Sequence, residues 1–145
     1  MSLVSYLFAT FLGIILAVHL AMNGQVGDTI KNPRVGNALF WCIGALAAVI
    51  IGITGWEPGL KERIKEVSPP LWLAGAMGAC LVFAIAWLLP QVGARAMFIT
   101  LIAGQVFGGM MLSQFGLLGS PVQTVSPMNA LGALVMVVGV VLATK

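Results

Sequence analysis

The feature that most constrains this chain is a series of five apolar stretches, each long enough to cross a lipid bilayer. An α-helix rises about 1.5 Å per residue, so about 20 residues cover the roughly 30 Å of hydrocarbon in a membrane. The sequence therefore predicts an all-α integral membrane protein with five transmembrane helices in a single domain, residues 1–145. The predicted spans are 3–22, 35–56, 71–89, 96–112 and 128–144, of which the last two lie near the lower limit of length.

The composition excludes most other classes of protein. Hydrophobic residues make up 60% of the chain and charged residues 8%, against about 25% charged residues in a typical soluble domain. The mean hydropathy of +1.07 excludes a soluble globular domain and a disordered chain. The seven basic residues form no cluster that could hold a nucleic acid.

Catalytic and metal-binding motifs are also missing from the sequence. It contains no phosphate-binding loop, nucleophile elbow, zinc-binding helix motif or paired carboxylates. Cys42 and Cys80 stand at no metal-ligand spacing, and His19 is the single histidine. We therefore expect no enzyme activity, no catalytic residue, no metal and no cofactor.

Prolines and glycines suggest where the spans begin and end. Pro69-Pro70 is expected to open the third span and Pro90 to close it. Residues 23–34 contain Gly24, Gly27, Asn32 and Pro33, a composition typical of a loop. Residues 113–127 form a second connection, which carries no charge.

The connection between the second and third spans has its own pattern. Leu60, Ile64 and Val67 recur at helical spacing among charged residues. This pattern predicts a short amphipathic helix on the membrane surface, and a solvated charged linker is the alternative.

The distribution of basic residues gives little bias in orientation. Membrane proteins place the loops with more Lys and Arg in the cytoplasm, and with five spans this chain has three basic residues on one side and four on the other. So small a difference favours insertion in both orientations and antiparallel pairing of two copies into ten helices, whereas a single weakly biased topology is the alternative. The two sets are Lys61, Arg63 and Lys65 against Lys31, Arg34, Arg95 and Lys145.

Polar side chains inside the predicted spans are candidates for a substrate pathway. Unpaired polar groups are costly in lipid, so they face the bundle interior or a water-filled cavity. His19 and Asn23 share a helix face, as do Asn37 and the aromatic Trp41, and Gln105 lies near the middle of the fourth span. The pathway candidates are His19, Asn23, Asn37, Trp41, Gln105, Ser113 and Gln114.

Each of these interpretations has a structural alternative. Asn23 and Gln105 could simply hydrogen-bond to neighbouring helices, and Asn37 is better placed to cap a helix end. His19 is the only titratable side chain well inside a span, because no Asp or Glu lies in a helix centre. Either His19 carries a proton, or transport is uncoupled, or the substrate is not a simple cation; a histidine that burial keeps neutral is the alternative.

Small residues recur every three or four positions in the later spans. Such stripes let helix backbones approach closely in a membrane. The fifth span has no strongly polar side chain between Met128 and Val141 apart from Asn129, so we expect it to contribute to dimer packing while the first four spans enclose the pathway. The candidates for dimer packing are Gly132, Met136, Gly139 and Ala143.

Several of these segments resemble one known family. Residues 102–108, IAGQVFG, followed by 115–119, FGLLG, are similar to a signature of the YdcZ-type inner-membrane exporters, which belong to the drug/metabolite transporter superfamily. Residues 19–27 with 37–44, and 131–140, resemble the family's first, second and last helices. Two positions depart from the pattern we expect of it. Ser113-Gln114 replaces an Asp-His pair, and His19 replaces a glutamine.

The resemblance implies a five-helix half-transporter, related to the small multidrug resistance proteins, in the bacterial inner membrane. It would work as an antiparallel homodimer, or with a sister protein of opposite topology. We therefore expect a secondary transporter that exports small organic solutes by alternating access. The alternative is a non-transporting structural or accessory membrane protein, whereas an ion channel lacks support because no charged ring or filter-like loop is present.

Overall fold

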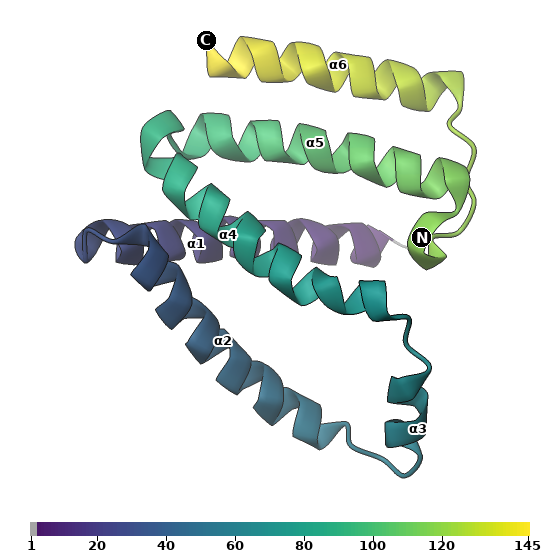
Figure 1. Ribbon diagram of the computed structural model, residues 1–145. Helices are drawn as coiled ribbons and strands as arrows, with labels where there is room; N and C mark the ends of the chain where they lie inside the picture. Colours follow the sequence, from purple (N-terminus) through teal and green to yellow (C-terminus); the bar gives the residue numbers. More distant parts are fainter. Residues whose placement is uncertain (1–2) are drawn as a thin grey trace. The chain divides into compact units, whose positions relative to one another are not determined.

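The computed structural model describes residues 3–145, which fold almost entirely into helices (Figure 1). Five segments are long and apolar enough to cross a membrane, which confirms the predicted all-helical class and the number of spans. The long helices are α1 (Leu3–Thr29), α2 (Pro33–Thr54), α4 (Leu73–Val92), α5 (Ala94–Phe115) and α6 (Pro127–Thr144). The short elements are α3 (Leu60–Lys65), η1 (Pro69–Trp72) and η2 (Leu117–Gly119).

The described chain divides into two compact units, residues 3–91 and 92–145. In the first unit, α1 packs against α2 after a tight turn, and α4 contacts both helices through small residues. In the second unit, α5 and α6 pack against each other as a helical hairpin.

The first helix is longer than the sequence analysis predicted. Residues 23–34 were expected to form a loop, but α1 continues to Thr29 and only residues 30–32 separate it from α2. Gly24 and Gly27 do not make a turn; they lie where α1 meets other helices. A Cβ atom at Gly24 would lie 3.4 Å from Cδ2 of Leu89 in α4. Glycine here reflects close helix packing, which the sequence alone does not distinguish from a turn.

The turn between α1 and α2 is set by its own short sequence. Lys31 adopts a left-handed conformation with φ 53°, and Asn32 caps α2 by accepting a hydrogen bond from the backbone N–H of Val35 at 3.2 Å. The interpretation of Asn37 as a helix cap is therefore wrong. Asn32 takes that role, because it directly precedes a proline in the first turn of α2.

Two further helix ends differ from the prediction. Pro90 does not close α4, which continues to Val92 and stops before Gly93, where φ is +78°. Helix α5 is 22 residues long instead of the predicted 96–112, and it ends at Gly116 in the left-handed conformation. Glycine adopts positive φ without steric cost, so these two residues mark the ends more reliably than the proline. The fourth span is thus not near the lower limit of length.

Helix α6 agrees closely with the fifth predicted span. Ser126 accepts a hydrogen bond from the backbone N–H of Asn129, and the Asn129 side chain accepts one from the backbone N–H of Ser126. This reciprocal capping box fixes the start of the helix.

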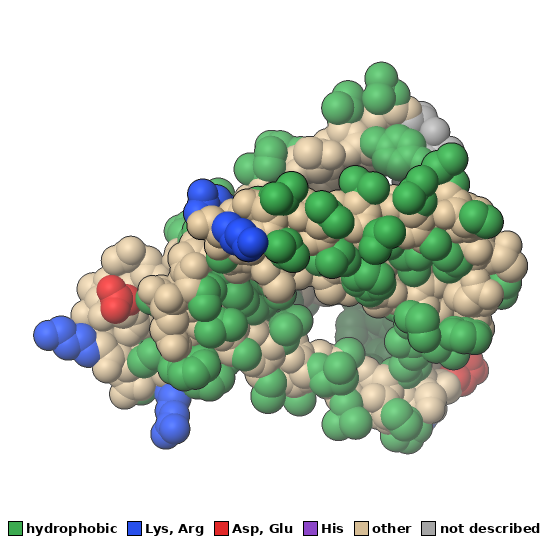
Figure 2. All heavy atoms as spheres, turned by 90° about the horizontal axis from the view of Figure 1, so that it is seen from above, with side chains coloured by type: hydrophobic (Ala, Val, Ile, Leu, Met, Phe, Trp, Pro, Cys, Tyr) green, Lys and Arg blue, Asp and Glu red, His purple; other side chains and the backbone are tan. Residues whose placement is uncertain are grey.

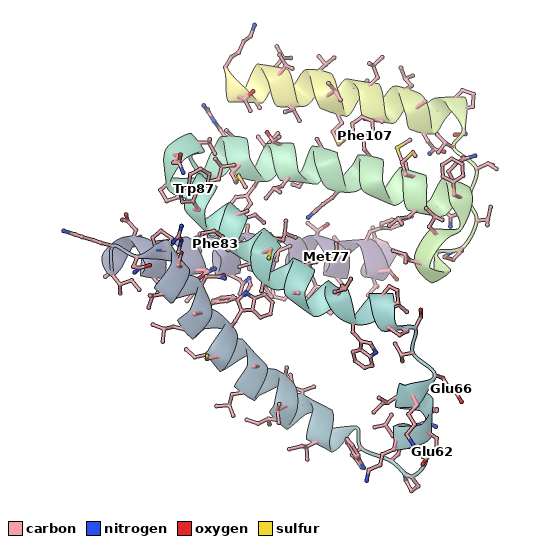
Figure 3. The ribbon with its side chains drawn as sticks, in the orientation of Figure 1. Glu62, Glu66, Met77, Phe83, Trp87 and Phe107 are labelled. Atoms are coloured by element: carbon pink, nitrogen blue, oxygen red, sulfur yellow. The ribbon has the colours of Figure 1, made fainter. Side chains whose placement is uncertain are left out.

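The predicted amphipathic segment does form a short helix, α3. The charged Glu62 lies in α3, and Glu66 follows its last residue (Figure 3). Leu60 and Val67 are half-buried. Trp56 and Trp72 lie on either side of the segment, and both are exposed. Tryptophan concentrates at membrane–water boundaries, so this arrangement supports an interfacial position for α3, which stays a prediction.

The surface of the long helices is apolar. Only six hydrophobic side chains are buried among the described residues, and many large ones are exposed. Figure 2 shows hydrophobic side chains spread over the visible face, with Lys and Arg confined to a few places. Exposing so much apolar surface to water would be strongly unfavourable, whereas the hydrocarbon core of a membrane accommodates it.

The close approach of α1 and α2 gives a first testable prediction. Gly36 is buried, and a Cβ atom there would lie 2.8 Å from the Cα of Gly27, so the two backbones would have to separate. We expect Gly36→Ala to lower the free energy of unfolding by about 1–3 kcal/mol, as overpacking does. Thermal unfolding in detergent measures it. Gly44→Ala is the matched control on the same helix, because a Cβ atom there meets nothing within 4 Å. Equal unfolding temperatures for the two variants would contradict this packing.

Candidate functional site

Three spanning helices of the first unit are joined by a line of polar groups, which we call the polar chain: Asn23, Asn37 and the carbonyl of Ala79. Asn23 of α1 is 1% exposed, and its Nδ2 donates to Oδ1 of Asn37 in α2 at 3.4 Å. The Nδ2 of Asn37 donates in turn to the backbone oxygen of Ala79 in α4, also at 3.4 Å. Both asparagines were candidates from the sequence, and the structure brings them together.

Small residues make the polar chain possible. Gly27 and Gly36 let α1 and α2 meet a few residues away from Asn23 and Asn37. On α4, Gly78 and Ala79 leave room for side chains of α2 to reach the helix backbone. A helical carbonyl has a second lone pair after its own helix bond, so Ala79 can accept this additional bond. Sequence reasoning missed Ala79, whose only signal was its place in a run of small residues.

Aromatic rings lie beside the polar chain. The ring centroids of His19 and Phe40 are 4.7 Å apart, and the two rings are tilted relative to each other. The ring centroids of Phe40 and Trp41 are 5.9 Å apart in an edge-on arrangement. The Trp41 ring packs against Gly78, where a Cβ atom would lie 3.5 Å from it. Phe40 was not a candidate from the sequence, since an apolar ring in an apolar span gives no distinctive signal.

A groove of about 370 Å³ runs along α1 and reaches α2; we call it the α1–α2 groove. His19, Asn23 and Phe40 contribute to it, and its other lining residues are aliphatic or methionine side chains of α1. Two polar side-chain atoms of the first unit are buried without a hydrogen-bond partner in the described part of the chain: Oδ1 of Asn23 and Nε1 of Trp41. Buried polar atoms without partners are uncommon and require a physical explanation.

A second groove of about 290 Å³ lies between α2 and α4. Asn37 and Ala79 line it together with Arg34, Cys80 and Phe83, the last of which is labelled on α4 in Figure 3. The polar chain therefore connects two grooves, one on each side of Asn37. No carboxylate lines either of them.

Charged groups lie away from these grooves, apart from Arg34. Within residues 3–145 the structure contains one ion pair, between Arg63 and Glu57, and both side chains are largely exposed. Exposed pairs stabilise a fold by about 0–1 kcal/mol, so this one does not determine the architecture. The same residues contain no group of three or more potential metal ligands.

In the second unit, Gln105 lies at the middle of α5. Its side chain is exposed and makes no hydrogen bond within the described chain. A shared cavity with His19 and Asn23 would join the two units and stays a prediction.

Ser113 and Gln114 form hydrogen bonds with the backbone of the loop between α5 and α6. The carbonyl of Ser113 accepts a bond from the backbone N–H of Gln123 at 2.9 Å, and Oε1 of Gln114 accepts one from the backbone N–H of Val125 at 2.6 Å. Ser113 also lines a hollow of about 450 Å³ at this end of the hairpin. The structure gives both residues a local structural role, and their role in the pathway stays a prediction.

The four residues of α6 predicted for dimer packing form two pairs that differ in exposure. Met136 and Ala143 are partly covered, on the side where Ala133 is buried. Gly132 and Gly139 are exposed, and a Cβ atom at either would meet nothing within 4 Å. This open glycine face is available for contact with another helix, and the dimer itself stays a prediction.

Comparison with known protein families identifies a match over most of the chain. A family model described as "Putative inner membrane exporter, YdcZ" matches residues 4–142, nearly the whole chain. No curated protein and no solved structure matches this chain.

Proposed function

Because the chain belongs to the YdcZ family of inner membrane exporters, we propose that it is a small secondary transporter that moves small organic solutes by alternating access. It is a multi-pass protein of the inner membrane, and its family points to transport and away from catalysis. The departures of His19 and Ser113-Gln114 from the expected family pattern concern coupling and leave this family membership intact.

The observation that carries the proposal is the polar chain between the two grooves. Amides inside membrane spans are costly unless they are satisfied by neighbouring helices, by water or by a ligand. Asn23 and Asn37 are only partly satisfied by each other and by Ala79, since Oδ1 of Asn23 has no partner. An apolar groove with a few polar groups on its wall is the usual form of a small-molecule site.

We further propose that the functional unit is an antiparallel pair, either of two copies or of this chain with a sister protein of opposite topology. The near balance of basic residues on the two sides supports it, as does the exposed amide of Gln105 in the middle of a span. A partner of opposite orientation would give the pair the in-plane symmetry found in many transporters. The open glycine face of α6, Gly132 with Gly139, is the proposed packing surface.

Orientation in the membrane is directly measurable. With three basic residues against four, we expect a C-terminal tag to be accessible from both sides of the inner membrane in cells. Pro121→Lys with Thr124→Lys should place the α5–α6 loop predominantly in the cytoplasm, because three plus two basic residues then exceed four. The same positions changed to Glu form the control, since acidic residues contribute little to orientation. A wild-type tag found on one side alone would contradict the homodimer and leave the sister protein as the partner.

Solute flux tests the proposed function. In proteoliposomes that contain the purified protein, alternating access predicts saturable counterflow of at least one member of a panel of labelled small organic solutes. A non-transporting accessory protein predicts no counterflow above protein-free liposomes for any of them. A channel would give flux that does not saturate and no counterflow.

A further inference from the structure

The groove of about 290 Å³ between α2 and α4, which we call the α2–α4 groove, contains polar groups that a bound molecule can reach. Arg34 is exposed and Asn37 is half-buried, and both line the groove. The other lining residues are Ala79, Cys80 and Phe83 of α4 (Figure 3 labels Phe83). The groove therefore combines accessible polar side chains with an apolar wall.

The polar side chains of this groove present hydrogen-bond donors. A guanidinium has five N–H groups and no acceptor, and Arg34 has no ion pair or side-chain hydrogen bond within residues 3–145. A backbone carbonyl can only accept, so the group of Asn37 that meets Ala79 must be its NH₂. The oxygen of Asn37 accepts from Asn23 in α1, whereas the NH₂ bonds once, to Ala79, and keeps a second N–H on the α4 side.

Arg34 and Asn37 are close enough to act on one ligand group. They are three residues apart on α2, so they share a helix face and lie about 4.5 Å apart along the axis. A carboxylate has two oxygens and can accept from the guanidinium with one and from the amide N–H with the other. Ala79 and Phe83, four residues apart on α4, share the face that forms the apolar wall.

We propose that the α2–α4 groove binds organic monoanions, whose carboxylate is held by Arg34 and Asn37 and whose apolar body lies against Ala79 and Phe83. Hydrogen bonds between a charged donor and a carboxylate are about twice as strong as neutral ones. No Asp or Glu lines the groove, so a cation would meet only the like charge of Arg34. This inference names the substrate class of the proposed transporter and rests on that proposal for its biological meaning, whereas the binding itself can be measured without transport.

Two molecules of nearly the same shape provide the test. Phenylacetate is an anion near neutral pH, whereas phenylacetamide is uncharged and has a donor in place of one carboxylate oxygen. We expect the purified protein in an uncharged detergent to bind phenylacetate about tenfold more tightly, because only the carboxylate pairs with Arg34 and accepts with both oxygens. Saturation-transfer NMR titration, with protein-free micelles as the blank, gives both dissociation constants. Equal affinity of the wild-type protein for the two molecules would overturn the proposal.

Variants locate the effect. Arg34→Gln should bring the ratio of the two dissociation constants close to one, and it should fold normally because Arg34 is exposed and has no partner within residues 3–145. Arg95→Gln is the matched control, since Arg95 is the second residue of α5, as Arg34 is of α2, and is exposed but does not line this groove. Both variants lower the net charge by one. A ratio that falls equally in both, or in neither, would place the anion elsewhere and overturn the proposal.

An anionic lipid offers the same chemistry, because its phosphate also pairs with arginine. We expect neither phosphatidylglycerol nor phosphatidylcholine, added in an amount equimolar with the protein, to change the ratio. Loss of the preference with phosphatidylglycerol alone would overturn the proposal, since the groove would then hold a lipid headgroup.

The result is independent of flux. A preference for phenylacetate that depends on Arg34, without counterflow of any solute, would keep this site and reject transport. Counterflow without that preference would keep transport and reject this substrate class.

Discussion

Replacing Asn37 by leucine is expected to abolish saturable counterflow of any solute that the wild-type protein carries. Asn37 is the central member of the polar chain, so its loss leaves Asn23 with no hydrogen-bond partner at all and removes the polar group between the two grooves. Hydrogen bonds between membrane helices contribute about 1–2 kcal/mol each, so the protein should still fold. Two such bonds are lost, about 2–4 kcal/mol together, so the unfolding temperature should fall by about 6–12 °C for a chain of this size.

The matched control for Asn37→Leu is Gln25→Leu. Both remove one amide from a long helix of the first unit, but Gln25 bonds only within α1, to Thr29. We expect Gln25→Leu to keep both the flux and the unfolding temperature of the wild type. If Asn37→Leu transports as well as this control does, the polar chain is only a structural contact between helices.

Replacing Gln105 by leucine is the second change with a large expected effect. Gln105 lies at the middle of α5, exposed and without a hydrogen bond within the described chain, so in the proposed pair it faces water or substrate. We expect Gln105→Leu to abolish counterflow, because the pathway loses an amide. Leucine has a similar volume and suits an apolar environment, so dimerisation and thermal stability should be preserved or improved.

The two variants are expected to differ in stability, and a general loss of folding cannot imitate the result expected for Gln105→Leu. Asn37→Leu should lose flux and stability together, whereas Gln105→Leu should lose flux alone. Counterflow and thermal unfolding of the same preparations separate the two outcomes. Wild-type flux in Gln105→Leu would remove this residue from the pathway.

The sequence predicts the class of this protein well, because lipid imposes a simple rule on the chain. Each span must be apolar over about 20 residues, so five such stretches identify five helices. The last span, 128–144, is nearly as predicted because Ser126, Pro127 and Asn129 form a local start signal. Such signals act between residues close in sequence, and a pattern can therefore identify them.

The sequence predicts helix ends poorly where a residue acts through contacts with another helix. Gly24 and Gly27 were interpreted as loop residues, yet they lie inside α1 at its contacts with α4 and α2. Pro90 was expected to end α4, but two more helical residues follow it. Glycine and proline give the same local signal in a turn and in a packed helix, so only the tertiary contact decides.

The candidate site was predicted in part. His19 with Asn23, and Asn37 with Trp41, were grouped correctly by helical spacing, which determines residues on one helix face. Spacing does not show which faces meet, so the bond between Asn23 and Asn37 and the role of Ala79 were not predicted. The cap assigned to Asn37 belongs to Asn32, because a proline follows Asn32 directly.

The most direct test of the central claim is whether water and solute reach the polar chain from both sides of the membrane. Asn37→Cys, made in a background with Cys42→Ala and Cys80→Ala, provides one thiol at the middle of the polar chain. A membrane-impermeant thiol reagent should modify it from either side in turn, and a bound solute should change the rate. Ile51→Cys in the same background is the control, because Ile51 is 70% exposed on the apolar surface of α2 and should not react. An Asn37→Cys thiol that stays unmodified from both sides in the folded protein, yet reacts fully after unfolding, would contradict the account.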